Sequence, residues 1–496
     1  MTLDPTSCYR ALATHDSRFD GVFFVGVTTT KIYCRPVCRA RLPGPDRCRF
    51  YPSAAAAEAA GFRPCLRCRP EKAPGRSIVD ARARLARSAA ARIEAGAMNG
   101  GGVEDLAAAL HTSSRQLRRA VRREYGATPV QLAQTHRLLL AKRLLTESDM
   151  SMTEIAFASG FSSVRRFNAL FRSRYRLSPT NLRRGRRGRS GRNQGGETFT
   201  LALDYRPPFD WEALLGFLAG RAVPGVEAVH DGHYARTVAI GEHRGWVAVS
   251  PVADRSTLQA EVSISLAPAL MPLLARLRVL FDLDAEPETI ASHLVADPIL
   301  APYVRRRPGL RVPGAMDGFE LAFRAVLGQQ VSVAAASTLA GRIAERFAES
   351  ADTGVRELSR FPVTAARLAD AGADRIASLG MPRSRAACIA HLAQRFAEGE
   401  LRLEPGADVD ETTHRLEELP GIGPWTAQYV AMRALHWPDA FPHSDLGIRK
   451  AFGDSSPSRL LRAASRWQPW RAYATMHLWQ SLSDRPELDK PRQEVA

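Results

Sequence analysis

The sequence predicts a multidomain protein with four folded parts: a small α+β domain, an all-α domain, an α+β domain built on an antiparallel sheet, and a second all-α domain. At 496 residues the chain is too long for one hydrophobic core, and chains of this length usually form three or four domains. Cysteines gather in two close pairs near the N-terminus. Hydrophobic residues follow a helical period, change to a period of two after about residue 198, and become helical again after about Pro313.

The net positive charge comes entirely from the first part of the chain. Residues 1–196 contain 36 Lys and Arg against 14 Asp and Glu, a net charge of +22, whereas the 33 basic and 37 acidic residues that follow give −4. A solubilising surface usually mixes both signs. An arginine-rich region of this kind predicts a polyanionic partner, and double-stranded DNA is the expected one.

The N-terminal residues lack the basic start and the apolar stretch of a signal peptide. The sequence also contains no apolar run long enough to span a bilayer. We therefore expect a cytoplasmic, nucleoid-associated protein with no membrane partner.

Four of the seven cysteines have the spacing of metal ligands. An odd cysteine count without a secretion signal argues against a disulfide framework. Cys34 with Cys38, and Cys65 with Cys68, form two short-spaced thiolate pairs, which predict one tetrahedral Zn²⁺. Spacing alone is most typical of a structural zinc site. The remaining cysteines have no partner at ligand spacing, and we expect ordinary thiols at Cys8, Cys48 and Cys388.

The residues around these cysteines resemble a known domain. Phe23–Cys38 and Gly61–Cys68 closely resemble the N-terminal domain of the Ada family of adaptive-response proteins. The resemblance implies that Cys34 irreversibly accepts a methyl group from a methylated DNA phosphate, with the other three cysteines as remaining ligands. Methylation would change the formal charge of a four-thiolate zinc site from −2 to −1, so that repair also weakens repulsion from DNA. The predicted zinc domain spans residues 1–75.

An internal repeat occupies the next predicted domain, residues 76–183. Leu106–Arg115 is echoed by Ile155–Val164, and each copy continues through a basic amphipathic helix to an aromatic residue and a proline. Arginines at the start of such helices can read bases in a major groove and contact phosphates. His111 stands at the turn where glycine is common. The candidate DNA-contacting residues are Arg115, Arg118, Arg119, Arg165 and Arg166.

The repeat resembles the AraC-type DNA-binding domain, which carries two helix-turn-helix units on one chain. Together with the zinc unit it resembles the regulatory half of Ada. This implies transcriptional activation of alkylation-repair genes, with promoter DNA and RNA polymerase as partners. The Arg- and Gly-rich stretch 184–197 predicts a flexible linker, and both a plain spacer and a tether that follows DNA phosphates remain open.

The third predicted domain, residues 198–312, contains strands. Residues 234–240 and 246–249 have strand patterns, and residues 258–266 alternate hydrophobic side chains with polar or small ones. Alternation of this kind is typical of a half-buried strand, so we expect an antiparallel sheet here.

A glycine-containing turn and a later aspartate mark the fourth predicted domain, residues 313–490. Gly421 and Gly423 lie in a stretch that reads as a helix-hairpin-helix turn, where backbone N–H groups can approach a DNA phosphate. Asp445 follows. The pair resembles the HhH-GPD glycosylase superfamily, in which that carboxylate is catalytic. Over roughly residues 198–485 the resemblance is closer to the AlkA family, the 3-methyladenine DNA glycosylases II.

The resemblance to these glycosylases implies roles for individual residues of the site. Asp445 would stabilise positive charge on the sugar and orient water, although a helix N-cap is the plain alternative. By family position, Trp425, Tyr429 and Trp479 would hold a flipped cationic base. Trp425 replaces the lysine of lyase-type relatives, which implies a monofunctional glycosylase. We expect neither an iron–sulfur cluster nor an organic cofactor. Gln330 occupies the position of the leucine wedge.

Two further tryptophans, Trp467 and Trp470, fit core packing as well as a pocket. The sequence contains no Pro-Cys-His-Arg motif, so we predict no reversal of O6-methylguanine.

Three functions remain open at this stage. The first is an alkylation-repair enzyme with a regulatory front half, favoured by Asp445 and the aromatic residues. The second is a transcriptional regulator whose glycosylase half is a non-catalytic DNA-binding scaffold, which only Gln330 favours. In the third, the zinc is inert and the front half only binds DNA.

Overall fold

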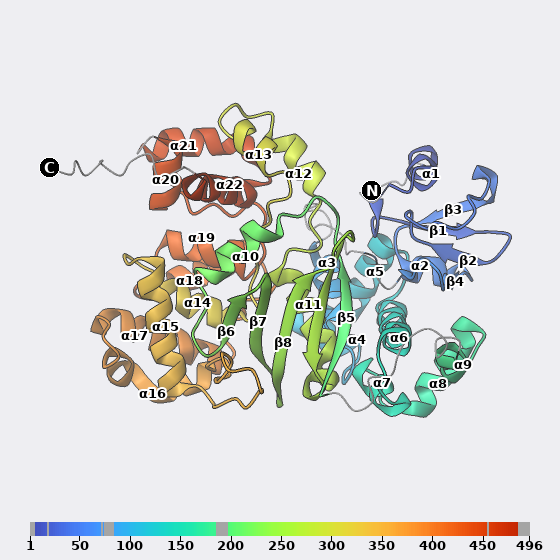
Figure 1. The fold of residues 1–496 in the computed structure, drawn as a ribbon, viewed down its shortest axis with the longest axis horizontal. Helices are drawn as coiled ribbons and strands as arrows, with labels where there is room; N and C mark the ends of the chain where they lie inside the picture. The colour runs from blue at the N-terminus through green and yellow to red at the C-terminus, as the bar shows by residue number, and fades with distance from the viewer. Residues whose placement is uncertain are drawn as a thin grey trace.

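The computed structural model describes residues 5–16, 19–70, 73, 84–184, 197–453 and 456–484. The predicted linker therefore lies outside the described residues except at its two ends. A five-stranded sheet lies at the centre of the molecule, with the zinc region and the repeated helical units on one side and helices α14–α19 on the other (Figure 1). The predicted multidomain fold class, with its four kinds of folded part, is confirmed.

The N-terminal region is a small mixed sheet with two helices. Strand β2 pairs antiparallel with β1 and parallel with β4, in the order β3-β1-β2-β4. Tyr33 is paired with Pro64, which places Cys34 and Cys65 next to each other at the ends of two neighbouring strands. The elements are α1 (Pro5–Ala13), β1 (Phe24–Val27), β2 (Ile32–Cys34), β3 (Cys48–Tyr51), α2 (Ala54–Ala59) and β4 (Arg63–Pro64).

Two helix-turn-helix units follow, as the repeat predicted. The elements are α3 (Arg84–Glu94), α4 (Val103–Ala109), α5 (Ser114–Tyr125), α6 (Pro129–Glu147), α7 (Met152–Ala158), α8 (Val164–Tyr175) and α9 (Pro179–Arg184). Both turns use left-handed backbone, with φ of +50° at His111 and +79° at Gly160. A Cβ at position 160 would lie 2.3 Å from Oδ1 of Asn99, so the second turn requires glycine. Histidine is among the non-glycine residues that adopt this conformation most readily, which accounts for His111.

The central sheet is antiparallel, in the order β5-β9-β8-β7-β6. Its elements are β5 (Thr198–Asp204), α10 (Trp211–Ala219), β6 (Glu227–His230), β7 (His233–Ile240), β8 (His243–Pro251), β9 (Thr257–Ser263) and α11 (Leu270–Leu280).

The predicted strand over 258–266 is wrong at its C-terminal end. Strand β9 ends at Ser263, and a 3₁₀ helix, η5 (Ile264–Ala269), follows. The Ser263 hydroxyl accepts from the Trp246 N–H at 2.8 Å and donates to its carbonyl at 3.1 Å, and Pro268 has no N–H for a sheet ladder. The alternation continues past the end of the strand because the 3₁₀ helix also buries Leu266.

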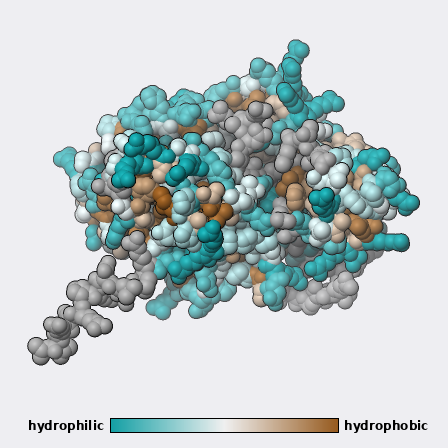
Figure 2. Space-filling view, turned by 90° about the horizontal axis from the view of Figure 1, so that it is seen from above, coloured by the Kyte–Doolittle hydropathy of each residue, from teal (hydrophilic) through white to brown (hydrophobic). Residues whose placement is uncertain are grey.

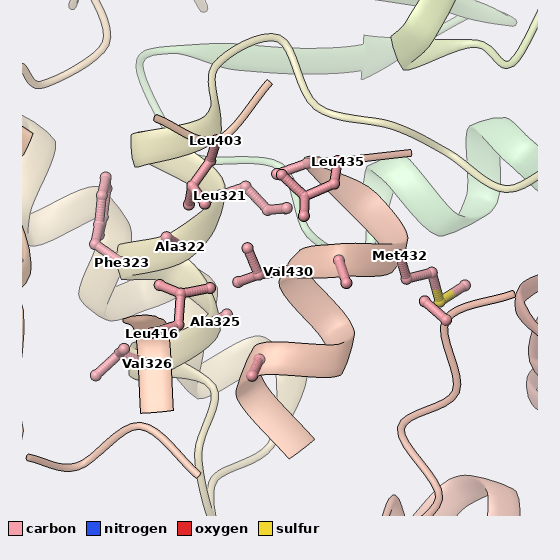
Figure 3. Packing of buried hydrophobic residues seen from close by; sticks show 14 of the residues in the cluster. Leu321, Ala322, Phe323, Ala325, Val326, Leu403, Leu416, Val430, Met432 and Leu435 are labelled. Atoms are coloured by element: carbon pink, nitrogen blue, oxygen red, sulfur yellow. The ribbon is translucent and has the colours of Figure 1, made fainter. Parts of the chain in front are cut away.

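The C-terminal part is helical and has the largest hydrophobic core. Phe319, Phe323, Val326 and Leu327 of α14 are all buried there, as their helical spacing predicted. Figure 3 shows α14 side chains packed against Val430 of α19. The helices are α12 (Pro287–Leu294), α13 (Ala301–Arg306), α14 (Gly318–Leu327), α15 (Val333–Phe347), α16 (Ala365–Ala377), α17 (Arg383–Ala397), α18 (Val409–Glu417), α19 (Pro424–Arg433), α20 (Leu446–Phe452), α21 (Pro457–Ala464) and α22 (Arg471–Ser483).

The front and back halves of the chain are packed together. Side chains of α6, α7 and α8 share one hydrophobic core with the central sheet and α11. The fully buried Arg206 donates to the carbonyl of Asp20 in the zinc region at 3.1 Å and to that of Asp284 at 2.7 Å. Hydrophilic residues cover most of the face drawn in Figure 2, and hydrophobic ones form small groups. Within the described part of the chain, no helix combines the length and the apolar character needed to cross a membrane.

Candidate metal centre and active site

The four predicted zinc ligands lie together. The Sγ atoms of Cys34, Cys38, Cys65 and Cys68 all lie within 4.8 Å of one another. Tetrahedral Zn²⁺ with Zn–S bonds of about 2.3 Å needs sulfur atoms about 3.8 Å apart. The backbone N–H of Arg35 points at Cys68 Sγ at 3.4 Å, a contact that favours a thiolate. The donor set and its spacing therefore fit one Zn²⁺.

Arg35 connects this centre to the central sheet. Its buried guanidinium pairs with Asp20, donates to the carbonyl of Cys68 at 3.2 Å, and donates to Asp204 of β5 at 3.2 Å. Burial opposes the charged form, but the interaction with Asp20 outweighs it and raises the pKa of Arg35. Lys142 of α6 donates to the carbonyl of Cys65 at 2.9 Å. The cysteine centre is thus in contact with both the helix-turn-helix part and the sheet.

The predicted DNA-contacting arginines lie on exposed faces of α5 and α8. Ser113 and Ser163 cap these helices through their side chains. Leu117 and Phe167 are fully buried, which turns the opposite face of each helix to solvent. On that face Arg115, Arg118, Arg119, Arg165 and Arg166 are exposed.

Asp445 is held by three N–H donors. Its Oδ1 accepts from the backbone N–H of Ile448 at 2.9 Å and from Trp479 Nε1 at 2.8 Å. Its Oδ2 accepts from Trp425 Nε1 at 3.0 Å. The carboxylate is therefore the N-cap of α20, the plain alternative raised from the sequence, and it is also fixed between two tryptophans.

Aromatic rings from three helices surround this carboxylate. The rings of Trp425 and Tyr429 are stacked, with centroids 5.4 Å apart and planes 14° apart. The ring centroid of Trp479, on α22, lies 6.3 Å from that of Tyr429 and 6.2 Å from that of Phe217, on α10. These residues and Asp445 line a cleft of about 1610 Å³. The sequence-predicted aromatic residues are thus brought together with Asp445, at the junction of the sheet domain and the helical domain.

Trp467 and Trp470 have the core role that the sequence left open. Their exposed fractions are 0% and 4%, and both belong to the largest hydrophobic cluster.

Sequence reasoning missed three residues of this cleft: Phe217, Arg221 and Arg433. Arg433 donates to the Tyr429 hydroxyl at 2.7 Å. Burial acts to raise the pKa of Tyr429, but the positive charges of Arg433 and neighbouring arginines lower it. Arg433 lies four residues after Tyr429 and eight after Trp425 on α19, and this helical spacing could have identified it. No local pattern connects Phe217 and Arg221 with α19.

The hairpin and the loop before α15 form one edge of the cleft. Gly421 has φ of +96°, and a Cβ there would lie 3.1 Å from Cys388 Sγ, so its backbone conformation calls for glycine. Around Gly423 there is open space that leaves its backbone approachable. The Gln329 side chain donates to the carbonyl of Gly421 at 2.8 Å. Gln330 is exposed at the rim, with φ of +55°.

Four family models match successive parts of the chain. They are the metal binding domain of Ada over residues 7–71, a helix-turn-helix domain over 106–185, the AlkA N-terminal domain over 200–317, and the HhH-GPD superfamily base excision DNA repair protein over 323–457. The fold and the sites therefore define a DNA glycosylase joined to an Ada-type zinc domain and a helix-turn-helix regulator.

Relatives include proteins that match the whole chain. It is 40% identical to the probable bifunctional transcriptional activator/DNA repair enzyme AlkA of Mycobacterium tuberculosis over 494 residues, 99% of both chains. It is 41% identical to DNA-3-methyladenine glycosylase 2 of Escherichia coli over 285 residues, 58% of this chain and 98% of the relative. It is 49% identical to the Escherichia coli bifunctional transcriptional activator/DNA repair enzyme Ada over 65 residues, 13% of this chain and 18% of the relative. The chain belongs to the family of bifunctional transcriptional activator/DNA repair enzymes AlkA.

These findings confirm several sequence predictions. The four-cysteine centre is an Ada-type site for one Zn²⁺. The chain binds DNA through its helix-turn-helix and glycosylase parts. The roles of individual site residues stay predictions.

Proposed function

We propose that the chain hydrolyses the glycosidic bond of alkylated bases of the 3-methyladenine type in double-stranded DNA, with Asp445 as the catalytic carboxylate. The observation that carries this proposal is the orientation of Asp445 by Trp425 and Trp479 at the wall of an aromatic cleft. A carboxylate held in this way needs no reorganisation when positive charge develops beside it.

The residues of the cleft have different roles in the proposed excision of the base. Alkylation makes a purine cationic, so a flipped base is attracted to the faces of Trp425, Tyr429 and Trp479. Asp445 stabilises positive charge on the sugar as the bond to the base breaks, and it orients the attacking water. Trp425 offers no amine at the position of the lyase lysine, so the reaction is hydrolysis without a Schiff base.

We also propose that Cys34 accepts a methyl group from a DNA phosphotriester. Bound Zn²⁺ would keep the thiol deprotonated at neutral pH. The Cys34 sulfur attacks the methyl carbon, and the phosphate leaves as a diester anion. The thioether makes the centre less negative, and the contacts of Arg35 with Asp20 and Asp204 lie directly beside the change.

The exposed arginines of α5 and α8 support a regulatory role. Two recognition helices on one chain can bind successive major grooves of promoter DNA. Activation would then require contact with RNA polymerase, and such a protein would act in the cytoplasm at the nucleoid.

One experiment tests both chemical activities. DNA carrying radiolabelled methyl groups is incubated with excess full-length protein, and label is measured in free base and in protein. We expect label in both fractions, with Asp445→Asn abolishing the first and Cys34→Ser the second.

Matched controls are available in the same domains. Asp408 caps α18 as Asp445 caps α20, so Asp408→Asn should leave excision unchanged. Cys48→Ser removes a buried thiol outside the metal centre and should leave methyl uptake unchanged. Label only in protein would leave a methyl sensor with a non-catalytic scaffold, and label only in free base would make the zinc centre structural.

A further inference from the structure

One edge of the central sheet is covered by the front half of the chain. Among the described strands, β5 is bonded to β9 alone, so its other edge has backbone groups that need partners. Helix α6 lies on that side of the sheet and supplies them at Ala202 (Figure 1). Arg143 donates to the Ala202 carbonyl, and Glu147 accepts from its N–H at 3.4 Å. The edge of the glycosylase half is thus closed by a helix of the regulatory half.

One route from the metal centre to this edge runs through Arg35. This residue directly follows Cys34, and its guanidinium donates to Asp204, the last residue of β5, at 3.2 Å. It also pairs with Asp20, whose carbonyl accepts from Arg206 at 3.1 Å. Arg206 is fully buried in the segment between β5 and α10. The contacts of Arg35 therefore reach both the end of β5 and the segment that leads to α10.

A second route runs through Arg69, which directly follows Cys68. The Nη2 atom of Arg69 lies 2.8 Å from Oε1 of Glu147, whose Oε2 accepts from the edge of β5. The residues that directly follow the other two ligands, Arg39 and Leu66, are exposed. The contacts toward the sheet are therefore made from two of the four ligand positions.

Loss of the metal would remove the support of both routes. Four thiolates are held together by one Zn²⁺, and the free energy of metal binding orders the two cysteine loops. Without that order, the arginines beside the ligands lose their fixed positions. Asp204 and Glu147, with side chains 12% and 11% exposed, would then each lose an ion pair while still largely buried. A buried charge that loses its partner is strongly destabilising, so entry of water at the edge of β5 becomes the favourable alternative.

We propose that Zn²⁺ binding in the front half regulates the glycosylase half by holding β5 and the segment that leads to α10 in place. Helix α10 carries Phe217 of the aromatic cleft. The metal therefore orders one wall of the cleft from a separate domain, through contacts that are continuous in the structure. Removal of the metal releases β5, loosens α10 and slows excision. The effect on excision rests on the proposed glycosylase activity, whereas the effect on β5 does not.

Hydrogen exchange of the full-length protein, followed by mass spectrometry, tests this inference. The zinc-loaded protein is compared with protein treated with a chelator and with protein to which zinc has been returned. We expect exchange in β5 to rise by about tenfold or more after chelation, the change that follows from loss of a hydrogen bond to a charged group. Exchange in α10 should rise with it, and both should return to their initial rates with zinc. Base release by the same samples should be slower without zinc.

The opposite edge of the same sheet provides an internal control. Strands β6 and β7 lie there, and their exchange should stay slow after chelation. Asp46→Asn changes an exposed carboxylate of the zinc region and should leave the zinc dependence of β5 as in the wild type.

Variants of the two carboxylates test the route itself. The double variant Asp204→Asn with Glu147→Gln keeps the side-chain sizes but removes both charges. It should still bind one equivalent of zinc, and its β5 should exchange rapidly with or without the metal. The single variant Asp204→Asn keeps the contact of Arg69 with Glu147 and should show an intermediate zinc dependence.

Unchanged exchange in β5 after chelation would overturn the inference. An equal rise in β6 and β7 would also overturn it, because the whole chain would then unfold without zinc. Zinc-dependent exchange as large in both variants as in the wild type would exclude these carboxylates as the route. If the zinc-loaded wild type releases no base, the proposed glycosylase activity fails, and the exchange of β5 still decides whether the metal holds the sheet edge.

Discussion

Replacing Asp445 by Asn removes the negative charge of this side chain but keeps its ability to cap the N-terminus of α20. Asn is as good an N-cap as Asp, so the bond from the Ile448 N–H to the side-chain oxygen can remain. The amide has one acceptor oxygen, however, and its NH₂ group must then face either Trp425 or Trp479. Leaving one indole N–H without its acceptor should cost about 1–3 kcal/mol of stability.

The expected loss of activity is larger. A full negative charge about 4 Å from a developing positive charge contributes about 4 kcal/mol at an effective dielectric constant of about 20. Removal of that charge should slow excision about 10³-fold. A destabilisation of about 1–3 kcal/mol leaves a protein of ordinary stability folded, so unfolding cannot produce such a loss.

The assay is single-turnover release of methylated base by excess full-length protein, with thermal unfolding measured on the same samples. Asp408→Asn tests the general effect of an Asp-to-Asn change at a helix N-cap. If Asp445→Asn keeps more than a tenth of the wild-type rate, the charge of this carboxylate does not drive the reaction. If the variant is unfolded at the assay temperature, the estimate of its stability cost is wrong.

Three further predictions concern other parts of the chain. Gln330→Leu should raise the excision rate by roughly tenfold, because an apolar wedge unstacks DNA more readily; equal rates in a base-release assay would exclude this residue as the wedge. Asp204→Ala removes the sheet partner of Arg35 and should lower the free energy of unfolding by about 1.5–3 kcal/mol, measured in urea; unchanged stability would mean that Asp20 alone satisfies Arg35. Burial lowers the pKa of His477 to about 4, so the unfolded chain binds a proton that the folded chain excludes between about pH 6.5 and 4. The contribution of neutral His477 to the free energy of unfolding is complete above that pH range and should fall by about 3 kcal/mol as the pH drops through it. His477→Gln should remove this part of the pH dependence. The same dependence of the unfolding free energy on pH in both proteins would contradict the assignment.

The features predicted best from the sequence are those set by neighbours along the chain. Ligand spacing identified the two cysteine pairs, because the two cysteines of each pair are close together in the sequence. The two helix-turn-helix units were predicted because amphipathic period and turn residues are local properties. The alternation in β9 was read correctly, but its end was not, since the Ser263 contact with Trp246 comes from the neighbouring strand.

The aromatic cleft also combines residues that the sequence indicated with residues that it did not. Asp445 and the aromatic residues Trp425, Tyr429 and Trp479 were named from their positions in a family resemblance, and their contacts could not be predicted. Phe217 and Arg221 come from α10 and the turn after it, more than 200 residues before α19. Periodicity and motif spacing describe residues close in the sequence, so they cannot predict a contact between segments this far apart in the chain.

By itself, then, the sequence determined the kinds of domain and the metal ligands, because secondary structure and ligand spacing depend on residues close in the chain. The tertiary structure alone decided how these parts meet. The parallel pairing of β2 with β4 joined the two cysteine pairs. The contact of Arg35 with Asp204, 169 residues apart, connected the zinc centre to the central sheet. Burial of apolar surface between distant segments selects such contacts, and that selection depends on the whole packed chain.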